Sequence, residues 1–244
     1  MADALRVFKY SLRDFWDKFM LLVVLNLVWS LAVILPILPL FVLREANVLS
    51  VLALSLLLFL PLPIVSGALC FVANQISRGK PAGWGSFFVG VRRYWAKSMI
   101  VALINLVVLV LVITNIQFYG LALEGTWTNF AVSLWLIVGA YWVLIQVFWF
   151  PMVLELESEK ILLALRNALA MTIITPGFSV TLVVLLIAVM ALCLLLTVPA
   201  LLFMASFILL ICNHATRSRL ALARRRTYEP GVELDKQTEP QERS

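Results

Sequence analysis

The chain has 244 residues, of which 63% are apolar and 13% are charged, and its formal net charge is +6 at pH 7. Its mean hydropathy of +1.03 lies far above that of water-soluble domains. This composition excludes an ordinary soluble domain and predicts an all-helical protein that crosses a membrane several times.

Residues 1–18 are predicted to form an amphipathic helix on the cytoplasmic membrane surface. Apolar side chains recur on one stripe at helical spacing, and basic side chains lie beside that stripe. The stripe consists of Leu5, Phe8, Leu12, Phe15, Trp16 and Phe19. The apolar run that follows is too long for the apolar core of a cleaved signal peptide, so we expect it to remain as a helix.

A six-helix transmembrane domain is predicted over residues 19–213. Apolar runs place the spans at about residues 19–43, 48–77, 98–119, 130–154, 178–197 and 199–213. The last two spans come from one uncharged run, which as a single helix would be about 54 Å long and would exceed the bilayer core. Pro199 is expected to interrupt that helix.

The distribution of charge supports six spans. With six spans, all of the 19 Lys and Arg residues except Arg44 fall on one face of the membrane. The positive-inside rule assigns that face to the cytoplasm. We therefore expect both termini to be cytoplasmic.

A basic and aromatic segment, RGKPAGWGSFFVGVRRYWAK, occupies residues 78–97. In a soluble protein this mixture would suggest nucleic-acid binding. Between two membrane spans it is typical of an interfacial "elbow" helix, with rings at the headgroup boundary and cations toward anionic lipid. We predict lipid-headgroup contacts and no nucleic-acid partner for this segment. The contact residues are Trp84, Arg92, Arg93 and Trp95.

A third elbow is predicted in SEKILLALRNALAM, with Ser158 as its N-cap. The chain thus has three units of elbow helix plus transmembrane hairpin. Residues 214–226 are expected to extend the last helix into the cytoplasm as a basic end, where Arg224, Arg225 and Arg226 contact anionic headgroups. Residues 227–244 are polar and are predicted to be disordered.

Three segments carry a family resemblance: NLVWSLAVILP, LPLPIVSGALCFVANQISRGKPAGWGSFFVGVRRYW and FWFPMVLELESEKILLALRNALAMTIITP. They resemble the YesL-like family of bacterial integral membrane proteins, a domain of unknown function. The connection between the first two segments is longer here than in the family pattern. The resemblance implies a bacterial cell membrane, an accessory role in carbohydrate uptake and transporter subunits as partners. It implies no catalytic residues.

Candidate chemistry is sparse in the sequence. No ionisable residue falls within a predicted span, which weighs against an ion-coupled carrier. A single histidine, His214, cannot form a metal site. The acidic run ELESEK, residues 155–160, is interpreted as a solvated loop. We expect no enzymatic activity, no cofactor and no metal.

Uncharged polar side chains remain within the predicted spans, and two interpretations of them stay open. They either hydrogen-bond one helix to another or line a path for a neutral solute. They are Asn26, Asn105, Asn115, Gln117 and Gln146. The first interpretation favours a non-enzymatic accessory or scaffold protein, and the second favours a permease-type subunit.

Overall fold

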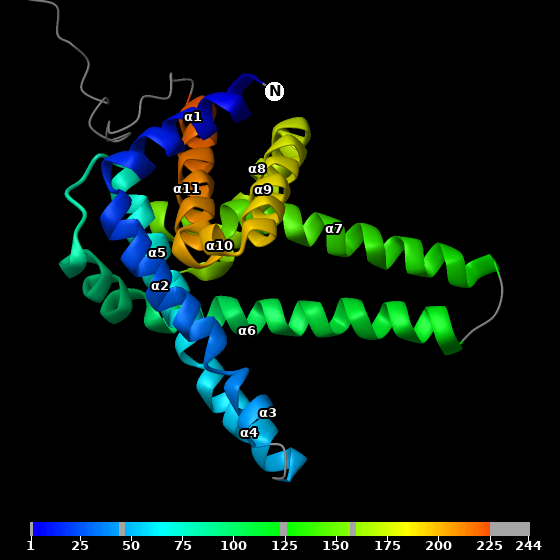
Figure 1. Ribbon diagram of the computed structural model, residues 1–244. Coiled ribbons are helices and arrows are strands. Elements are labelled where there is room, and N and C mark those ends of the chain that lie inside the picture. Colours follow the sequence, from blue (N-terminus) through cyan, green and yellow to red (C-terminus); the bar gives the residue numbers. More distant parts are fainter. Residues whose placement is uncertain (1, 44–46, 123–125, 157–159, 225–244) are drawn as a thin grey trace, which may run out of the picture.

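The computed structural model describes residues 2–43, 47–122, 126–156 and 160–224, and within these ranges the chain is helical without strands (Figure 1). The helices are α1 (Ala2–Asp17), α2 (Phe19–Ile34), α3 (Leu38–Val42), α4 (Val48–Phe59), α5 (Pro61–Ser77), α6 (Trp84–Ala122), α7 (Thr126–Glu155), α8 (Ile161–Ile174), α9 (Pro176–Leu196), α10 (Val198–Leu202) and α11 (Met204–Ala223). The predicted all-helical class is therefore confirmed.

Four helical segments in the described part of the chain are long and apolar enough to cross a membrane. They are Val48–Ser77, Trp84–Gly120, Trp127–Glu155 and Pro176–Leu196. A fifth is obtained if α1 and α2, which meet at a bend of 94°, are counted as one broken span. These helices indicate a membrane protein, whereas six spans and the orientation of the termini stay predictions.

Several of the helix breaks coincide with prolines. Pro39 lies in the first turn of α3 and Pro61 begins α5 directly after α4. Near Pro199, α9 ends at Leu196 and Thr197 has a φ of 54°, in the left-handed region. The short helix α10 follows, and α11 starts only at Met204. Proline lacks an N–H and fixes its own φ, which explains why the long apolar runs are divided here.

The elbows differ from their predicted form. The second is not a separate helix, because α6 runs without interruption from Trp84 through the following apolar run. In α1, the side chains that face the protein are Ala4, Val7, Ser11 and Phe15, while Leu5 and Trp16 of the predicted stripe are exposed. The segment between Trp84 and the apolar run contains no proline that would end the helix.

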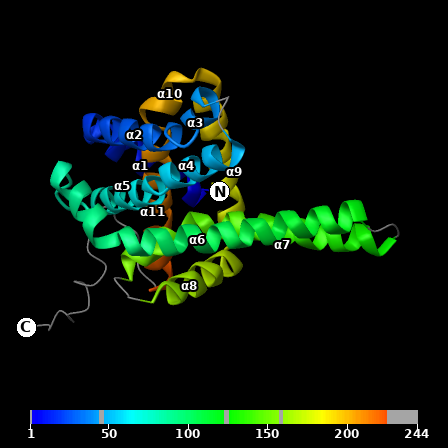
Figure 2. The ribbon, with the colours of Figure 1, turned by 90° about the horizontal axis from the view of Figure 1, so that it is seen from below.

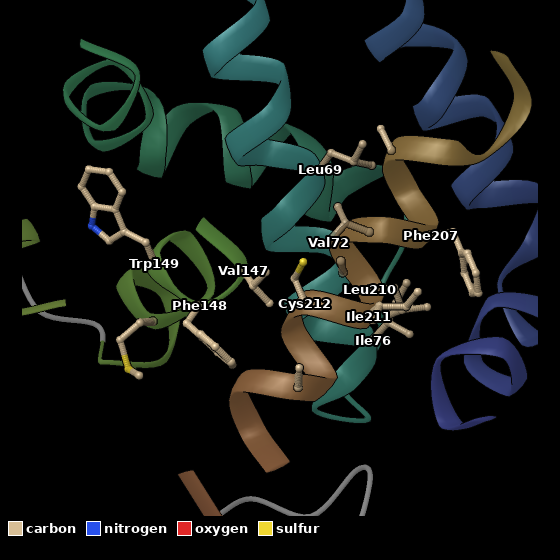
Figure 3. Packing of buried hydrophobic residues seen from close by; sticks show 14 of the residues in the cluster. Leu69, Val72, Ile76, Val147, Phe148, Trp149, Phe207, Leu210, Ile211 and Cys212 are labelled. Atoms are coloured by element: carbon tan, nitrogen blue, oxygen red, sulfur yellow. The ribbon is translucent and has the colours of Figure 1, made fainter. Parts of the chain in front are cut away.

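Helix α11 lies at the centre of the molecule, with α1, α2, α5, α7 and α9 packed around it (Figure 1). Figure 3 shows Leu210, Ile211 and Cys212 of α11 close to Leu69, Val72 and Ile76 of α5. Helix α11 continues to Ala223, and within the predicted basic end at residues 214–226 the consecutive residues from His214 to Arg219 are all buried. This region forms part of the core because other helices supply partners for its polar side chains.

Helices α6 and α7 lie side by side and extend away from α11 (Figures 1 and 2). Their outer parts expose large apolar side chains, including Leu109, Phe118, Trp127 and Phe130. Such surface is costly in water and favourable in hydrocarbon. This arm therefore fits a lipid environment.

Close packing of α5 against α6 depends on glycine. A Cβ atom added at Gly90 would lie 3.0 Å from the backbone Cα of Ala68 and 3.1 Å from the Phe71 ring. We expect Gly90→Val to lower the free energy of unfolding by about 1–3 kcal/mol, because the two helices must separate. Thermal unfolding in detergent measures this loss. Gly85→Val is the matched control, since nothing lies within 4 Å of its added Cβ; equal losses at both glycines would contradict the close packing.

Candidate functional site

A largely enclosed carboxylate, Glu155, lies where the ends of α5 and α7 meet α11, and its side chain is 9% exposed. Asn74 Nδ2 donates a hydrogen bond to Glu155 Oε1 at 2.9 Å. Arg78 donates from Nη2 to Oε2 at 3.2 Å and from Nε to Oε1 at 3.4 Å. Arg217 Nε lies 4.0 Å from Oε1. One carboxylate thus faces two guanidinium groups, and we call these residues together with Asn213 the Glu155 cluster.

Helical spacing brings the members of the Glu155 cluster together. Asn74 and Arg78 are four residues apart on α5, and Asn213 and Arg217 are four apart on α11, so each pair lies on one helix face. Asn74 Nδ2 also donates to Asn213 Oδ1 at 3.1 Å. Asn213 Nδ2 in turn donates to the Leu209 carbonyl at 2.8 Å. The hydrogen bonds therefore connect α5, α7 and α11 continuously.

Two further polar contacts connect α11 to α1. His214 Nε2 lies 3.0 Å from Asp14 Oδ2, and Arg219 Nη2 donates to Asp3 Oδ2 at 2.9 Å. The Arg219 guanidinium also lies 3.7 Å from the centre of the Phe178 ring, which permits a cation–π interaction. The hydrogen bond from Arg219 lowers the pKa of Asp3. Because ionisation of Asp3 is favoured in the folded state, this contribution to stability is present near neutral pH and is lost as the pH falls through that lowered pKa.

The ion pairs Arg78–Glu155 and Arg219–Asp3 join α5 to α7 and α11 to α1. Removing one partner of a buried pair leaves a charge without compensation, which is strongly destabilising. In the described part of the chain, no group of three His, Cys, Asp or Glu side chains is placed to hold a metal ion. The chemistry that the cluster supports is structural pairing.

The interpretation of residues 155–160 as a solvated loop is wrong for Glu155, because other helices enclose its carboxylate. Glu157, Ser158 and Glu159 lie outside the described residues. Helix α8 begins at Ile161, so its N-cap is Lys160 and the prediction of Ser158 as N-cap was wrong. The sequence carried one usable signal: Glu155, Arg78 and Arg217 each follow an apolar run on the same predicted side of the membrane. Charges of opposite sign at that common depth can pair.

Asn26 forms a second polar contact site, at the break between α10 and α11. Its Nδ2 donates to the carbonyls of Leu201 at 2.7 Å and Ala200 at 3.4 Å. Its Oδ1 accepts from the backbone N–H of Ser206 at 3.1 Å. The side chain thus satisfies backbone groups that the interrupted helix cannot pair itself. For Asn26, the geometry is that of a helix-to-helix contact.

A lateral groove of about 660 Å³ is formed by side chains of α4, α5, α6 and α7 with Leu209 of α11, and it is predominantly apolar. Its polar lining consists of Ser66, Ser98, Asn105 and Gln146. Asn105 Oδ1 accepts from Trp142 Nε1 at 3.0 Å, and Ser98 donates to the Tyr94 carbonyl at 2.9 Å. Gln146 Nε2 is buried without a hydrogen-bond partner among the described residues. The structure therefore brings Asn105 and Gln146 together in the groove and places Asn26 elsewhere.

The other predicted polar residues lie outside the groove. Asn115 donates to the Leu111 carbonyl of its own helix at 2.7 Å, and Gln117 is exposed. The predicted headgroup contacts Trp84, Arg92, Arg93 and Trp95 are exposed near the start of α6, and Arg224 is exposed at the end of α11. Arg225 and Arg226 lie outside the described residues, as does the segment 227–244.

Comparison with known proteins gives no match for this chain among family models, curated proteins or solved structures.

Proposed function

We propose that this protein is a non-enzymatic accessory or scaffold protein of a bacterial cell membrane, with both termini in the cytoplasm. The observation that supports this role is that polar side chains at the helix contacts pair with other parts of the chain. Asn26 pairs with backbone groups of α10 and α11, and Glu155 pairs with Asn74 and Arg78. These contacts stabilise the helix arrangement, as expected of a protein that presents a fixed surface to other membrane proteins.

The link to carbohydrate uptake rests on the resemblance to the YesL-like family described above, and transporter subunits are the partners it suggests. The test is extraction of the tagged full chain from its native membrane in mild detergent, followed by mass spectrometry of the co-purifying proteins. We expect uptake-transporter subunits to be enriched over an unrelated multi-pass membrane protein extracted in the same way. Equal recovery with both baits would overturn the accessory role.

A second candidate, a permease-type subunit for a neutral solute, is favoured by the position of Asn105 and Gln146 in one groove. If the groove conducts solute, the double variant Asn105→Ala with Gln146→Ala should lower flux into reconstituted vesicles at least about tenfold, the loss expected for two hydrogen bonds. Asn115→Ala serves as the control, because Asn115 bonds within its own helix. Flux that survives the double variant would exclude this path.

A further inference from the structure

A second pocket, of about 490 Å³, lies at the bend of 94° where α1 is followed by α2 (Figure 1). The end of α1, the first turns of α2 and the residues just before and at the start of α6 line it. Its lining includes two tryptophans, Trp16 and Trp84, one acidic residue, Asp17, and one basic residue, Lys18. Unlike the lateral groove, this pocket therefore has charged groups of both signs beside aromatic rings.

These four side chains are accessible to a ligand. Trp16 is 65% exposed and Trp84 is 50% exposed, and Asp17 and Lys18 are also exposed. The Trp16 ring stacks on the Phe19 ring, with 5.4 Å between their centres and an angle of 19° between their planes. In the described part of the chain, neither Asp17 nor Lys18 forms an ion pair or a side-chain hydrogen bond. Both charges are therefore available to a ligand.

The lining complements a ligand that carries both signs of charge. The faces of Trp16 and Trp84 attract an ammonium group through their ring quadrupoles, and the Asp17 carboxylate attracts it by its charge. The ammonium of Lys18, at the next position in the chain, suits a phosphate. A carboxylate and an ammonium at adjacent positions thus match a zwitterion in which a phosphate and an ammonium are joined by a short linker.

An exposed apolar stripe leads away from the pocket along α2. Met20 and Val24 line the pocket, and Leu27 and Leu31 continue the same face at helical spacing. All four side chains are exposed, and α2 carries no charged residue. From Met20 to Leu31 the helix covers about 16 Å at 1.5 Å per residue, which is close to half of the ~30 Å hydrocarbon thickness of a bilayer. The stripe therefore suits an acyl chain of one leaflet.

We propose that this pocket binds the headgroup of one phosphatidylethanolamine, a zwitterionic glycerophospholipid that ends in a primary ammonium. The ammonium contacts the rings of Trp16 and Trp84 and donates a hydrogen bond to Asp17. The phosphate lies beside Lys18, and one acyl chain follows α2 toward Leu31. This site is independent of the proposed accessory role.

The test uses the delipidated full chain in detergent, and native mass spectrometry measures the binding of added lipid. Phosphatidylglycerol is the comparison lipid, because it has the same phosphate but no ammonium. The wild type is expected to bind phosphatidylethanolamine about tenfold more tightly, as an exposed ion pair together with cation–π contacts predicts. Asp17→Asn should reduce that preference about threefold. Equal or weaker binding of phosphatidylethanolamine by the wild type would overturn the proposal, and this comparison needs no variant.

A second variant tests the aromatic part of the pocket. Trp84→Leu should weaken binding of phosphatidylethanolamine about threefold, because one ring face is lost. Trp95→Leu is the matched control, since Trp95 is a 55% exposed tryptophan of the same helix that does not line the pocket. It should bind as the wild type does. Equal losses in both variants would contradict the site.

Soluble glycerophosphoethanolamine, which carries the headgroup without acyl chains, distinguishes a membrane lipid from a small solute. It should displace bound phosphatidylethanolamine only at a concentration at least about a hundredfold higher, because it cannot bury apolar surface on α2. Displacement at an equal concentration would contradict the contact between the acyl chain and the stripe from Met20 to Leu31.

Discussion

Replacing Glu155 by alanine is expected to lower the free energy of unfolding by about 3–5 kcal/mol, the usual cost of breaking a buried ion pair from one side. The substitution leaves Arg217, whose side chain is 2% exposed, and Arg78, whose side chain is 12% exposed, without the carboxylate that they share. It also removes an acceptor from Asn74. Unfolding of the detergent-solubilised protein, followed by circular dichroism over a denaturant titration, measures this loss.

Asp17→Ala is the matched control for the charge, because Asp17 is an exposed acidic residue at the end of α1. It should change stability by no more than about 0.5 kcal/mol. Removing Arg78 together with Glu155 should cost less than the sum of the two single substitutions, since the two side chains contact each other directly. A loss for Glu155→Ala no larger than for Asp17→Ala would show that the cluster does not hold the three helices together.

Asn26→Leu is expected to lower the free energy of unfolding by about 2–4 kcal/mol, since backbone groups at the break between α10 and α11 lose their partners at roughly 1–3 kcal/mol each. The leucine is similar in size to asparagine, and the site is fully buried, so most of the loss reflects hydrogen bonding. Hydrogen exchange of the Ser206 amide gives a local measurement. This amide should exchange faster in the variant, because Asn26 Oδ1 is its acceptor.

Asn115→Leu is the corresponding control in the α6–α7 arm. Asn115 bonds only to the Leu111 carbonyl of its own helix among the contacts described. Its replacement should change stability by about 0.5 kcal/mol or less. If Asn26→Leu lowered the free energy of unfolding no more than Asn115→Leu does, the role of Asn26 in joining α2 to α11 would be excluded.

Local patterns predicted the helical class and several helix ends correctly. Uninterrupted apolar runs marked the long helices, and Pro61 and Pro199 lie where helices begin or break. These features depend on residues close together in the chain, since proline acts on its own turn and apolar length acts on one helix. Two interpretations were left open for the polar residues of the spans, and Asn26 and Asn105 each form a hydrogen bond with another helix.

The burial of α11 could not be predicted in the same way. Arg217 and Arg219 follow an apolar run, and a single sequence assigns such cations to the membrane surface. Their partners Glu155 and Asp3 lie far away in the sequence. Which distant carboxylate meets which guanidinium depends on helix packing, and periodicity within one helix carries no information about it. The groove is likewise formed only when α5, α6 and α7 come together.

The central position of α11 also has a consequence for how the protein is made. Chains are synthesised from the N-terminus, so α2, α5 and α7 are made before the helix that they surround. Until α11 is made, Asn26 lacks its contact with Ser206, and Glu155 lacks the nearby guanidinium of Arg217. The contacts that join α11 to α2, α5 and α7 can therefore form only after all of these helices have been made.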